Sequence, residues 1–217
     1  MTRRLLDCTA SELRTFQKDQ LLESIAGCEG RVMMCETIGI TPPLLGDVTN
    51  AEYAAALGAD ILLLNMFDVQ NPHLEALPES SPRETIRTLK HLTGRVIGIN
   101  LEPVDPRIAA GNAGTLWEMT PGRLATADNA RLAADMGVDL ILLTGNPGNG
   151  VANEAILATL SQLKAAVGDR VILAAGKMHA AGLPGQGGAN IMTTEDAQAF
   201  MEAGADIVLV PAPGTAP

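Results

Sequence analysis

The sequence predicts an α/β fold, a TIM (β/α)8-type barrel, of which about six βα units are visible in the 217 residues. Three observations predict it: apolar runs of strand length, helical patterns between them, and two kinds of segment that alternate three times. Alternating strands and helices form parallel sheets, because each helix returns the chain to the end at which the strands begin. We therefore expect residues 1–217 to form a single, partial barrel domain.

In the first repeated segment, a helical pattern is followed by Gly, then Ala or Val, then Asp, and then an apolar run. The glycine can end the helix with positive φ, and the run is typical of a strand buried on both faces. Thr49, Thr126 and Thr194 stand at the starts of the helices as candidate caps. The three aspartates are Asp60, Asp139 and Asp206.

The second repeated segment carries a basic residue and Val before its apolar run, at Arg31, Arg95 and Arg170. Helical patterns precede all three segments, and the first of them extends over residues 11–25. Together the two repeats predict six strands, at residues 31–36, 60–65, 95–101, 139–144, 170–176 and 206–211.

Three pairs of strands correspond to three quarters of a barrel, which needs four such pairs. We therefore expect strands seven and eight to be missing, either because the chain is truncated or because a partner chain completes the barrel. A complete six-stranded open sheet is the alternative. A dinucleotide-binding fold is less favoured, since no predicted strand is followed by Gly-x-Gly-x-x-Gly.

Composition points to a protein of the cytoplasm. No apolar stretch approaches the roughly 20 residues that span a membrane, and the N-terminus lacks the apolar core of a secretion signal. The three cysteines, Cys8, Cys28 and Cys35, fit no zinc spacing and suggest free thiols in a reducing compartment. A net charge of −10 and only 2% aromatic residues argue against nucleic acid or an anionic membrane as a partner. A small anionic metabolite stays possible, because backbone amides bind phosphate.

The carboxyl ends of the strands are where barrel enzymes carry out their chemistry. Every predicted strand ends in, or is followed by, polar residues or a glycine-rich loop. We expect the first four of the following residues to be catalytic and the rest to bind substrate: Lys177, His179, Glu36, Glu102, Asn65, Asp68, Asn100 and Asn146.

Lys177 is the sharpest of these candidates. Enclosure in a barrel mouth would lower the pKa of the lysine, so that it forms a Schiff base or transfers a proton. Its alternatives are an ion pair with Glu36 or Glu102, or a bound phosphate. His179 lies two residues further on, where it would share a strand face with the lysine and move a proton near neutral pH. Its alternative is a loop histidine hydrogen-bonded to the backbone.

A metal ion is a further possibility at these strand ends. Glu36 and Glu102 could hold Mg²⁺, which binds a few carboxylates together with several waters. No ligand-spacing motif accompanies them, and they could equally balance the charges of Lys177 and Arg107.

Glycine-rich loops follow the fourth and sixth strands and contain Gly145, Gly148, Gly214 and Thr215. Glycine lets backbone amides approach and cradle an anion, so we expect these residues to bind the anionic end of a substrate. Plain turn geometry is the alternative for each loop.

Four stretches of the chain resemble an uncharacterised bacterial family of TIM-barrel proteins, whose members are often labelled phosphonomutase-like or haloacid-dehalogenase-like hydrolases. They are residues 5–12, 64–72, 98–105 and 210–215. The resemblance implies a TIM barrel and no established reaction, and it implies two further strands beyond the Pro-Ala-Pro-Gly-Thr segment. The phosphonomutase superfamily holds Mg²⁺ with a run of aspartates, and no Asp-x-Asp pattern ends a strand here.

These observations favour an enzyme that acts on a small phosphorylated or carboxylated metabolite by lyase, aldolase or isomerase chemistry. The alternative is a non-catalytic phospho-ligand-binding or regulatory barrel. We also expect a homo-oligomer, because pairing between chains would cover the open edges of an incomplete barrel.

Overall fold

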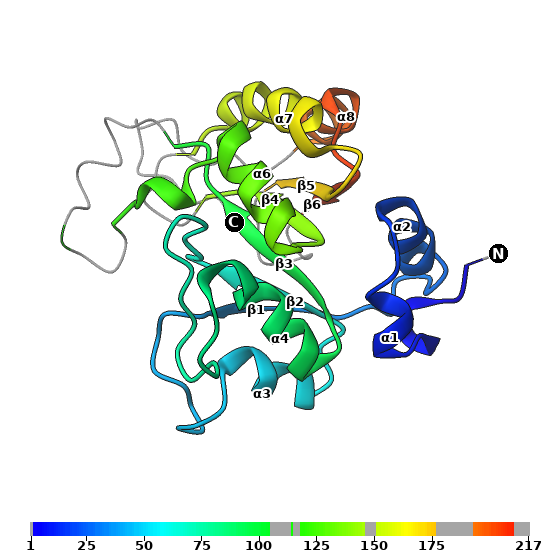
Figure 1. Cartoon of the computed structure of the whole chain (residues 1–217). Coiled ribbons are helices and arrows are strands. Elements are labelled where there is room, and N and C mark those ends of the chain that lie inside the picture. Colours follow the sequence, from blue (N-terminus) through cyan, green and yellow to red (C-terminus); the bar gives the residue numbers. More distant parts are fainter. Residues whose placement is uncertain (1, 105–113, 115–117, 146–150, 177–192, 211–217) are drawn as a thin grey trace. The chain divides into compact units, whose positions relative to one another are not determined.

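The structure is a computed structural model that describes residues 2–104, 114, 118–145, 151–176 and 193–210 (Figure 1). Six strands form one sheet whose strand order follows the chain. β1 and β2, β2 and β3, and β5 and β6 pair in parallel. The strands are β1 (Met34–Ile38), β2 (Ile61–Asn65), β3 (Val96–Leu101), β4 (Leu140–Leu143), β5 (Ile172–Gly176) and β6 (Ile207–Leu209).

This strand order confirms a parallel α/β fold and differs from that of a doubly wound sheet, in which the order reverses. The seventh and eighth strands, the truncation and the single barrel domain stay predictions. By its internal packing the chain divides into two compact units. Unit 1 comprises Met1–Ile99, Leu132–Leu140 and Asp169–Val171, and unit 2 comprises Asn100–Arg131, Ile141–Gly168 and Ile172–Pro217.

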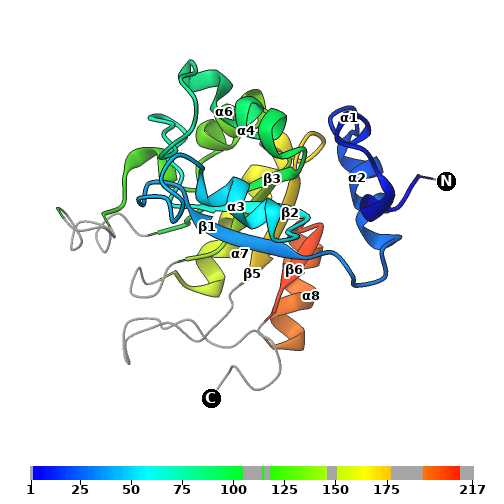
Figure 2. The same ribbon diagram turned by 90° about the horizontal axis from the view of Figure 1, so that it is seen from below.

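Helices connect the strands. In unit 1, α3 packs on β1 and β2, as Figure 2 shows, and in unit 2 α7 and α8 lie side by side (Figures 1 and 2). No helix in the described ranges combines the length and apolar character needed to cross a bilayer. The helices are α1 (Ala10–Leu13), α2 (Lys18–Ala26), α3 (Asn50–Ala56), α4 (Thr85–Thr93), α6 (Ala127–Met136), α7 (Asn153–Val167) and α8 (Thr194–Ala203), with 3-10 turns at Leu5–Asp7, Pro82–Glu84 and Pro121–Arg123.

The single helix predicted over residues 11–25 is wrong, because the chain forms α1 and α2 there. The Thr15 hydroxyl donates to the carbonyl of Glu12 at 2.8 Å, which occupies an acceptor that a longer helix would use. A new helix then starts at Lys18, after the N-cap residue Gln17, whose backbone N–H donates to the Gln20 side chain at 3.0 Å. Glutamine is an uncommon cap, so the sequence carried little sign of this break.

Side-chain caps start the helices of the first repeat much as predicted. Thr49 caps α3 and Thr126 accepts the backbone N–H of Asn129 in α6. The third cap is Thr193 rather than Thr194, because the Thr193 hydroxyl accepts the backbone N–H of Asp196. The glycines that follow these helices have φ of 103°, 94° and 110°, which confirms the positive φ expected there.

Each aspartate of the first repeat joins two strands at their amino ends, an arrangement we call the aspartate clip. The backbone N–H of Asp60 donates to the carbonyl of Met33, and the Asp60 carboxylate accepts the Met33 N–H, both at 2.8 Å. The same two bonds join Asp139 to Ile97 and Asp206 to Leu173. The motif therefore has a structural role at the end of the strands opposite to the predicted site.

Burial differs between the inner and outer strands of the sheet. All residues of β2, β3, β4 and β5 are buried, whereas β1 and β6 are partly exposed. The prediction that each apolar run is buried on both faces is therefore confirmed for β2 and β4 and wrong for β6. In unit 1 the packing is tight around Gly98, where a Cβ would lie 3.0 Å from the side chains of Leu63 and Leu140.

Candidate functional site

In unit 1, two of the predicted site residues meet across β1 and β2: Asn65 ends β2, whereas Glu36 is the middle residue of β1 and not, as predicted, its end. Asn65 Nδ2 donates to Glu36 Oε1 at 2.6 Å. Asn65 is the last residue of β2 and is only 7% exposed, whereas Glu36 is exposed. The buried strand thus positions an amide that fixes one oxygen of a carboxylate open to solvent.

The backbone turns sharply after this pair. Met66 has φ of 61°, in the left-handed region that costs a non-glycine residue about 1 kcal/mol or more. Asp68 follows, and its Oδ1 accepts the backbone N–H groups of Gln70 and Asn71 at 2.8 and 2.9 Å. These bonds give Asp68 a part in shaping the loop, while its substrate-binding role stays a prediction.

In unit 2, the end of β3 carries a buried ion pair. Arg123 Nη2 donates to Glu102 Oε1 at 2.6 Å, and the side chains are 4% and 2% exposed. Backbone bonds hold the two residues together, since the Glu102 N–H donates to the Arg123 carbonyl at 3.0 Å. Arg123 Nη1 also donates to the carbonyl of Glu118 at 2.7 Å. A cavity of about 470 Å³ opens beside Glu102, with α7 as one wall.

Asn100 lies two residues before Glu102, on the same side of β3. It is 4% exposed, and its carbonyl oxygen Oδ1 has no hydrogen-bond partner among the described residues. A second buried asparagine of unit 2 gives a contrast, because Asn129 Nδ2 donates to the carbonyls of Pro121 and Leu124, each at 2.8 Å. A buried acceptor without a partner costs about 1–3 kcal/mol, and among the described residues Asn100 shares this condition with single buried atoms of Thr37, Arg95, Thr120 and Arg123.

Arg123 is the residue that sequence reasoning missed. The expectation that Glu102 balances Lys177 or Arg107 did not include the cation that binds it, which lies 21 positions away. Little in the sequence pattern marked Arg123 as a site residue, because it lies at the end of a loop and does not follow a predicted strand. A charged residue beside a Pro-Gly turn near a strand end is the one hint the sequence contained.

Gly145 follows β4 and is enclosed by packing. A Cβ at this position would lie 2.3 Å from a methyl carbon of Val151, so the close approach requires glycine. Its role in binding an anion stays a prediction. The remaining predicted site residues lie outside the described residues: Lys177, His179, Asn146, Gly148, Gly214 and Thr215.

The carboxylates predicted to hold Mg²⁺ each already accept a hydrogen bond, Glu36 from Asn65 and Glu102 from Arg123. A guanidinium at 2.6 Å would repel a cation at Glu102. Within the described ranges there is no group of three or more His, Cys, Asp or Glu side chains that could hold a metal. These residues by themselves therefore do not fit a Mg²⁺ site, and we assign no step to a metal.

A family model described as "Domain of unknown function (DUF7916)" matches residues 6–217. The chain belongs to this family. Membership of an uncharacterised family is thus confirmed, whereas the haloacid-dehalogenase label has no support in the comparisons. No curated protein matches the DUF7916 sequence.

Several solved structures are similar to the DUF7916 chain. One is 2,3-dimethylmalate lyase, a PEP mutase/isocitrate lyase superfamily member, at 12% identity over 90% of this chain and 62% of that one, with a TM-score of 0.49. QR15, an aldolase, is 15% identical over 88% and 73%, with a TM-score of 0.46. A putative lyase/mutase from Burkholderia cenocepacia J2315 is 18% identical over 88% and 64%, with a TM-score of 0.48. The chain thus spans 62–73% of the length of these three proteins.

Proposed function

We propose that the DUF7916 protein is an enzyme that acts on a small phosphorylated or carboxylated metabolite by lyase, aldolase or isomerase chemistry. The observation that carries the proposal is Asn100, whose buried carbonyl oxygen lacks a partner at the carboxyl end of β3. An O–H or N–H group of a bound substrate would complete this acceptor. The ion pair of Glu102 and Arg123 stands two residues away and gives the strand end a fixed charge distribution.

Many lyases, aldolases and isomerases that act on carbonyl compounds share one step, the transfer of a proton at the carbon beside the carbonyl. Glu36 has the chemistry of a general base, and the hydrogen bond from Asn65 orients it. Lys177 and His179 are the other candidate proton-transfer groups, and the glycine loops would bind the anionic end of the substrate. We further propose that the protein is a cytoplasmic homo-oligomer. Its ligand would be a small anionic metabolite rather than nucleic acid or a membrane.

Hydrogen–deuterium exchange tests the shared step without knowledge of the natural substrate. The protein is incubated in D₂O with pyruvate, 2-oxobutyrate or dihydroxyacetone phosphate, and loss of the C–H signal beside the carbonyl is followed by proton NMR. We expect at least one probe to exchange, and Asn100→Ala to slow that exchange about tenfold or more, as loss of one good hydrogen bond to a ligand does.

Asn129→Ala is the matched control. It removes a buried amide with two partners, so it should lower the free energy of unfolding by about 2 kcal/mol while leaving exchange per folded molecule unchanged. Asn100→Ala should change unfolding by less than about 1 kcal/mol, since it removes an unpaired oxygen. Equal exchange rates for Asn100→Ala and the unaltered protein would contradict the proposal. Saturable binding of a probe without exchange would instead favour the non-catalytic, ligand-binding barrel.

A further inference from the structure

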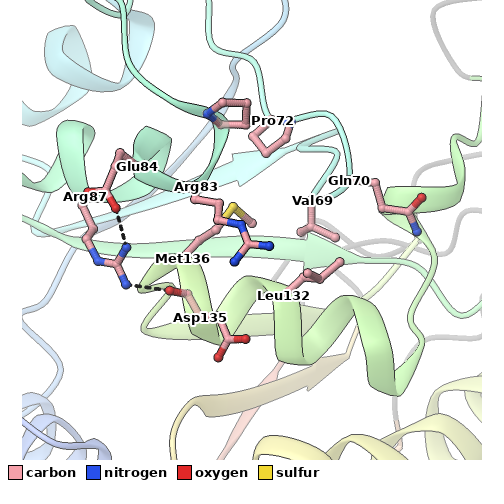
Figure 3. Close-up of a pocket in the computed structure, with 10 residues that line it drawn as sticks. Val69, Gln70, Pro72, Arg83, Glu84, Arg87, Leu132, Asp135 and Met136 are labelled. Atoms are coloured by element: carbon pink, nitrogen blue, oxygen red, sulfur yellow. Dashed lines mark hydrogen bonds and ion pairs between the residues drawn. The ribbon is translucent and has the colours of Figure 1, made fainter.

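Unit 1 contains a cavity of about 580 Å³ that none of the predicted site residues lines (Figure 3). Its walls come from residues 69–72, the start of α4 and the last two turns of α6. The volume lies within the range of roughly 300–1,000 Å³ that is common for small-molecule sites. The cavity is therefore large enough for a ligand, and its lining decides which kind.

One side of the cavity is apolar. Val69 and Met136 are each 4% exposed and form its inner surface, while Leu132 of α6 is 38% exposed on its rim. An accessible leucine within a concave surface favours a ligand with an apolar part, which would remove the leucine from water.

Two arginines and two carboxylates line the cavity, so its lining carries no net charge, but these groups are not all paired with one another. The carboxylate of Glu84 is paired with Arg87 at 2.8 Å, and that of Asp135 with Arg170 at 2.7 Å. Arg87 also donates to the backbone carbonyl of Asp135 at 2.6 Å. Arg83, in contrast, has no ion pair or side-chain hydrogen bond to any residue in the described ranges. Figure 3 shows it extending over the cavity, on the side where Val69 and Leu132 lie.

We infer that this cavity binds a small organic oxyanion that carries an apolar body. The forked guanidinium of Arg83 would bind the carboxylate or phosphate group through two parallel hydrogen bonds. The apolar body would lie against Leu132, Val69 and Met136. Because Glu84 pairs with Arg87 and Asp135 with Arg170, Arg83 is the charged group of the lining that is left to bind such an anion in the described part of the chain.

The test is an NMR titration of methyl-labelled protein with four probes: hexanoate, hexyl phosphate, hexanol and inorganic phosphate. We expect both hexyl anions to shift the methyl signals of Val69, Leu132 and Met136 saturably. Hexanol lacks the charge and inorganic phosphate lacks the apolar body, so each should bind about tenfold more weakly or worse. The tighter of the two hexyl anions tells whether the site prefers a carboxylate or a phosphate.

Arg83→Gln keeps much of the side chain and removes its charge, so it should weaken the binding of hexanoate about tenfold. Arg131→Gln is the control, because it removes an exposed arginine of α6 that does not line the cavity. The inference is overturned if no probe shifts these methyl signals at millimolar concentration. Binding of hexanol as tight as that of hexanoate, or unchanged binding in folded Arg83→Gln, would overturn it as well.

Discussion

At the amino ends of the strands the same aspartate clip occurs three times, at Asp60, Asp139 and Asp206. The carboxyl ends instead carry polar groups that differ from strand to strand, such as Asn65 at the end of β2 and Glu102 directly after β3. A hydrogen-bonded motif that recurs in each repeat is expected where every repeat needs the same stabilisation. Polar residues that are not repeated are what the proposed binding of a substrate would require, and barrel enzymes divide stability and chemistry between the two ends of their strands in this way.

Burial of charge also differs between the two ends. Asp139 of the amino end pairs with Lys90 at 2.6 Å, and their side chains are 20% and 15% exposed. Burial raises the pKa of the Asp139 carboxyl above its ordinary value, and Lys90 offsets part of that rise. Glu102 and Arg123 of the carboxyl end are far less exposed, at 2% and 4%. Loss of one charge should therefore have the larger effect at the carboxyl end.

The largest effect is expected for Arg123→Met, which removes the guanidinium that pairs with the buried Glu102 carboxylate. We expect the free energy of unfolding, measured in urea, to fall by about 3–5 kcal/mol. Arg131→Met breaks an exposed ion pair and should cost less than about 1 kcal/mol. The double variant Glu102→Leu/Arg123→Met should regain most of the stability yet lose the proton exchange. A cost for Arg123→Met no larger than that for Arg131→Met would remove the contrast between the two ends.

The stability that each aspartate clip contributes should depend on the partners of its aspartate. Asp139→Ala removes an acceptor of the Ile97 N–H and the charge that faces Lys90, so we expect a loss of about 2–3 kcal/mol. Asp60 has no ion pair among the described residues, and Asp60→Ala should cost about 1–2 kcal/mol. Asp139→Asn keeps a hydrogen-bond acceptor, so its loss of stability should lie between those of Asp139→Ala and Asp60→Ala. Urea unfolding measures all three, and a larger loss for Asp60→Ala than for Asp139→Ala would show that Lys90 contributes little.

The smallest effect concerns α1, which covers the amino end of β3 where Ala10 lies close to Gly94. Hydrogen bonds from the backbone and hydroxyl of Thr9, and then from Arg3, lower the pKa of Glu12 from 4.5 to about 2. A carboxyl with a lowered pKa stabilises the fold above its ordinary pKa and loses that contribution as the pH falls toward the lowered value.

Glu12→Gln should therefore lower the Tm slightly at neutral pH, and the difference from the unaltered protein should shrink as the pH falls from 4.5 to about 2. Thermal unfolding across this pH range measures the difference. Glu195→Gln on α8, an exposed glutamate outside the hydrogen bonds of its capping box, serves as the control and should show no such trend. A difference that stays constant with pH would mean that the cap does not depend on the charge of Glu12.

Sequence patterns predicted the strands well and the site only in part. Five of the six predicted strands start within two residues of the observed ones, while β1 starts three residues later, at Met34. The delay follows a turn in which Glu29 and Gly30 have positive φ. Of the site residues, Glu36 and Asn65 were both predicted and do meet, since β1 and β2 pair in parallel and Glu36 lies opposite Leu63, two residues before Asn65. The repeated aspartates were recognised as a pattern, but their hydrogen bonds to Met33, Ile97 and Leu173 depend on strand pairing that no local pattern encodes.

The sequence by itself determined the elements of this protein, because apolar periodicity, capping threonines and helix-ending glycines act over a few residues. Only the tertiary structure decided which polar groups find partners. Glu102 meets Arg123 across 21 positions, Asn100 is left with an unpaired oxygen, and Arg83 stands without an ion pair beside Leu132 of another helix. Such contacts depend on how distant segments pack and exclude water, and the cost of an unpaired or buried charge appears only once that packing is in place.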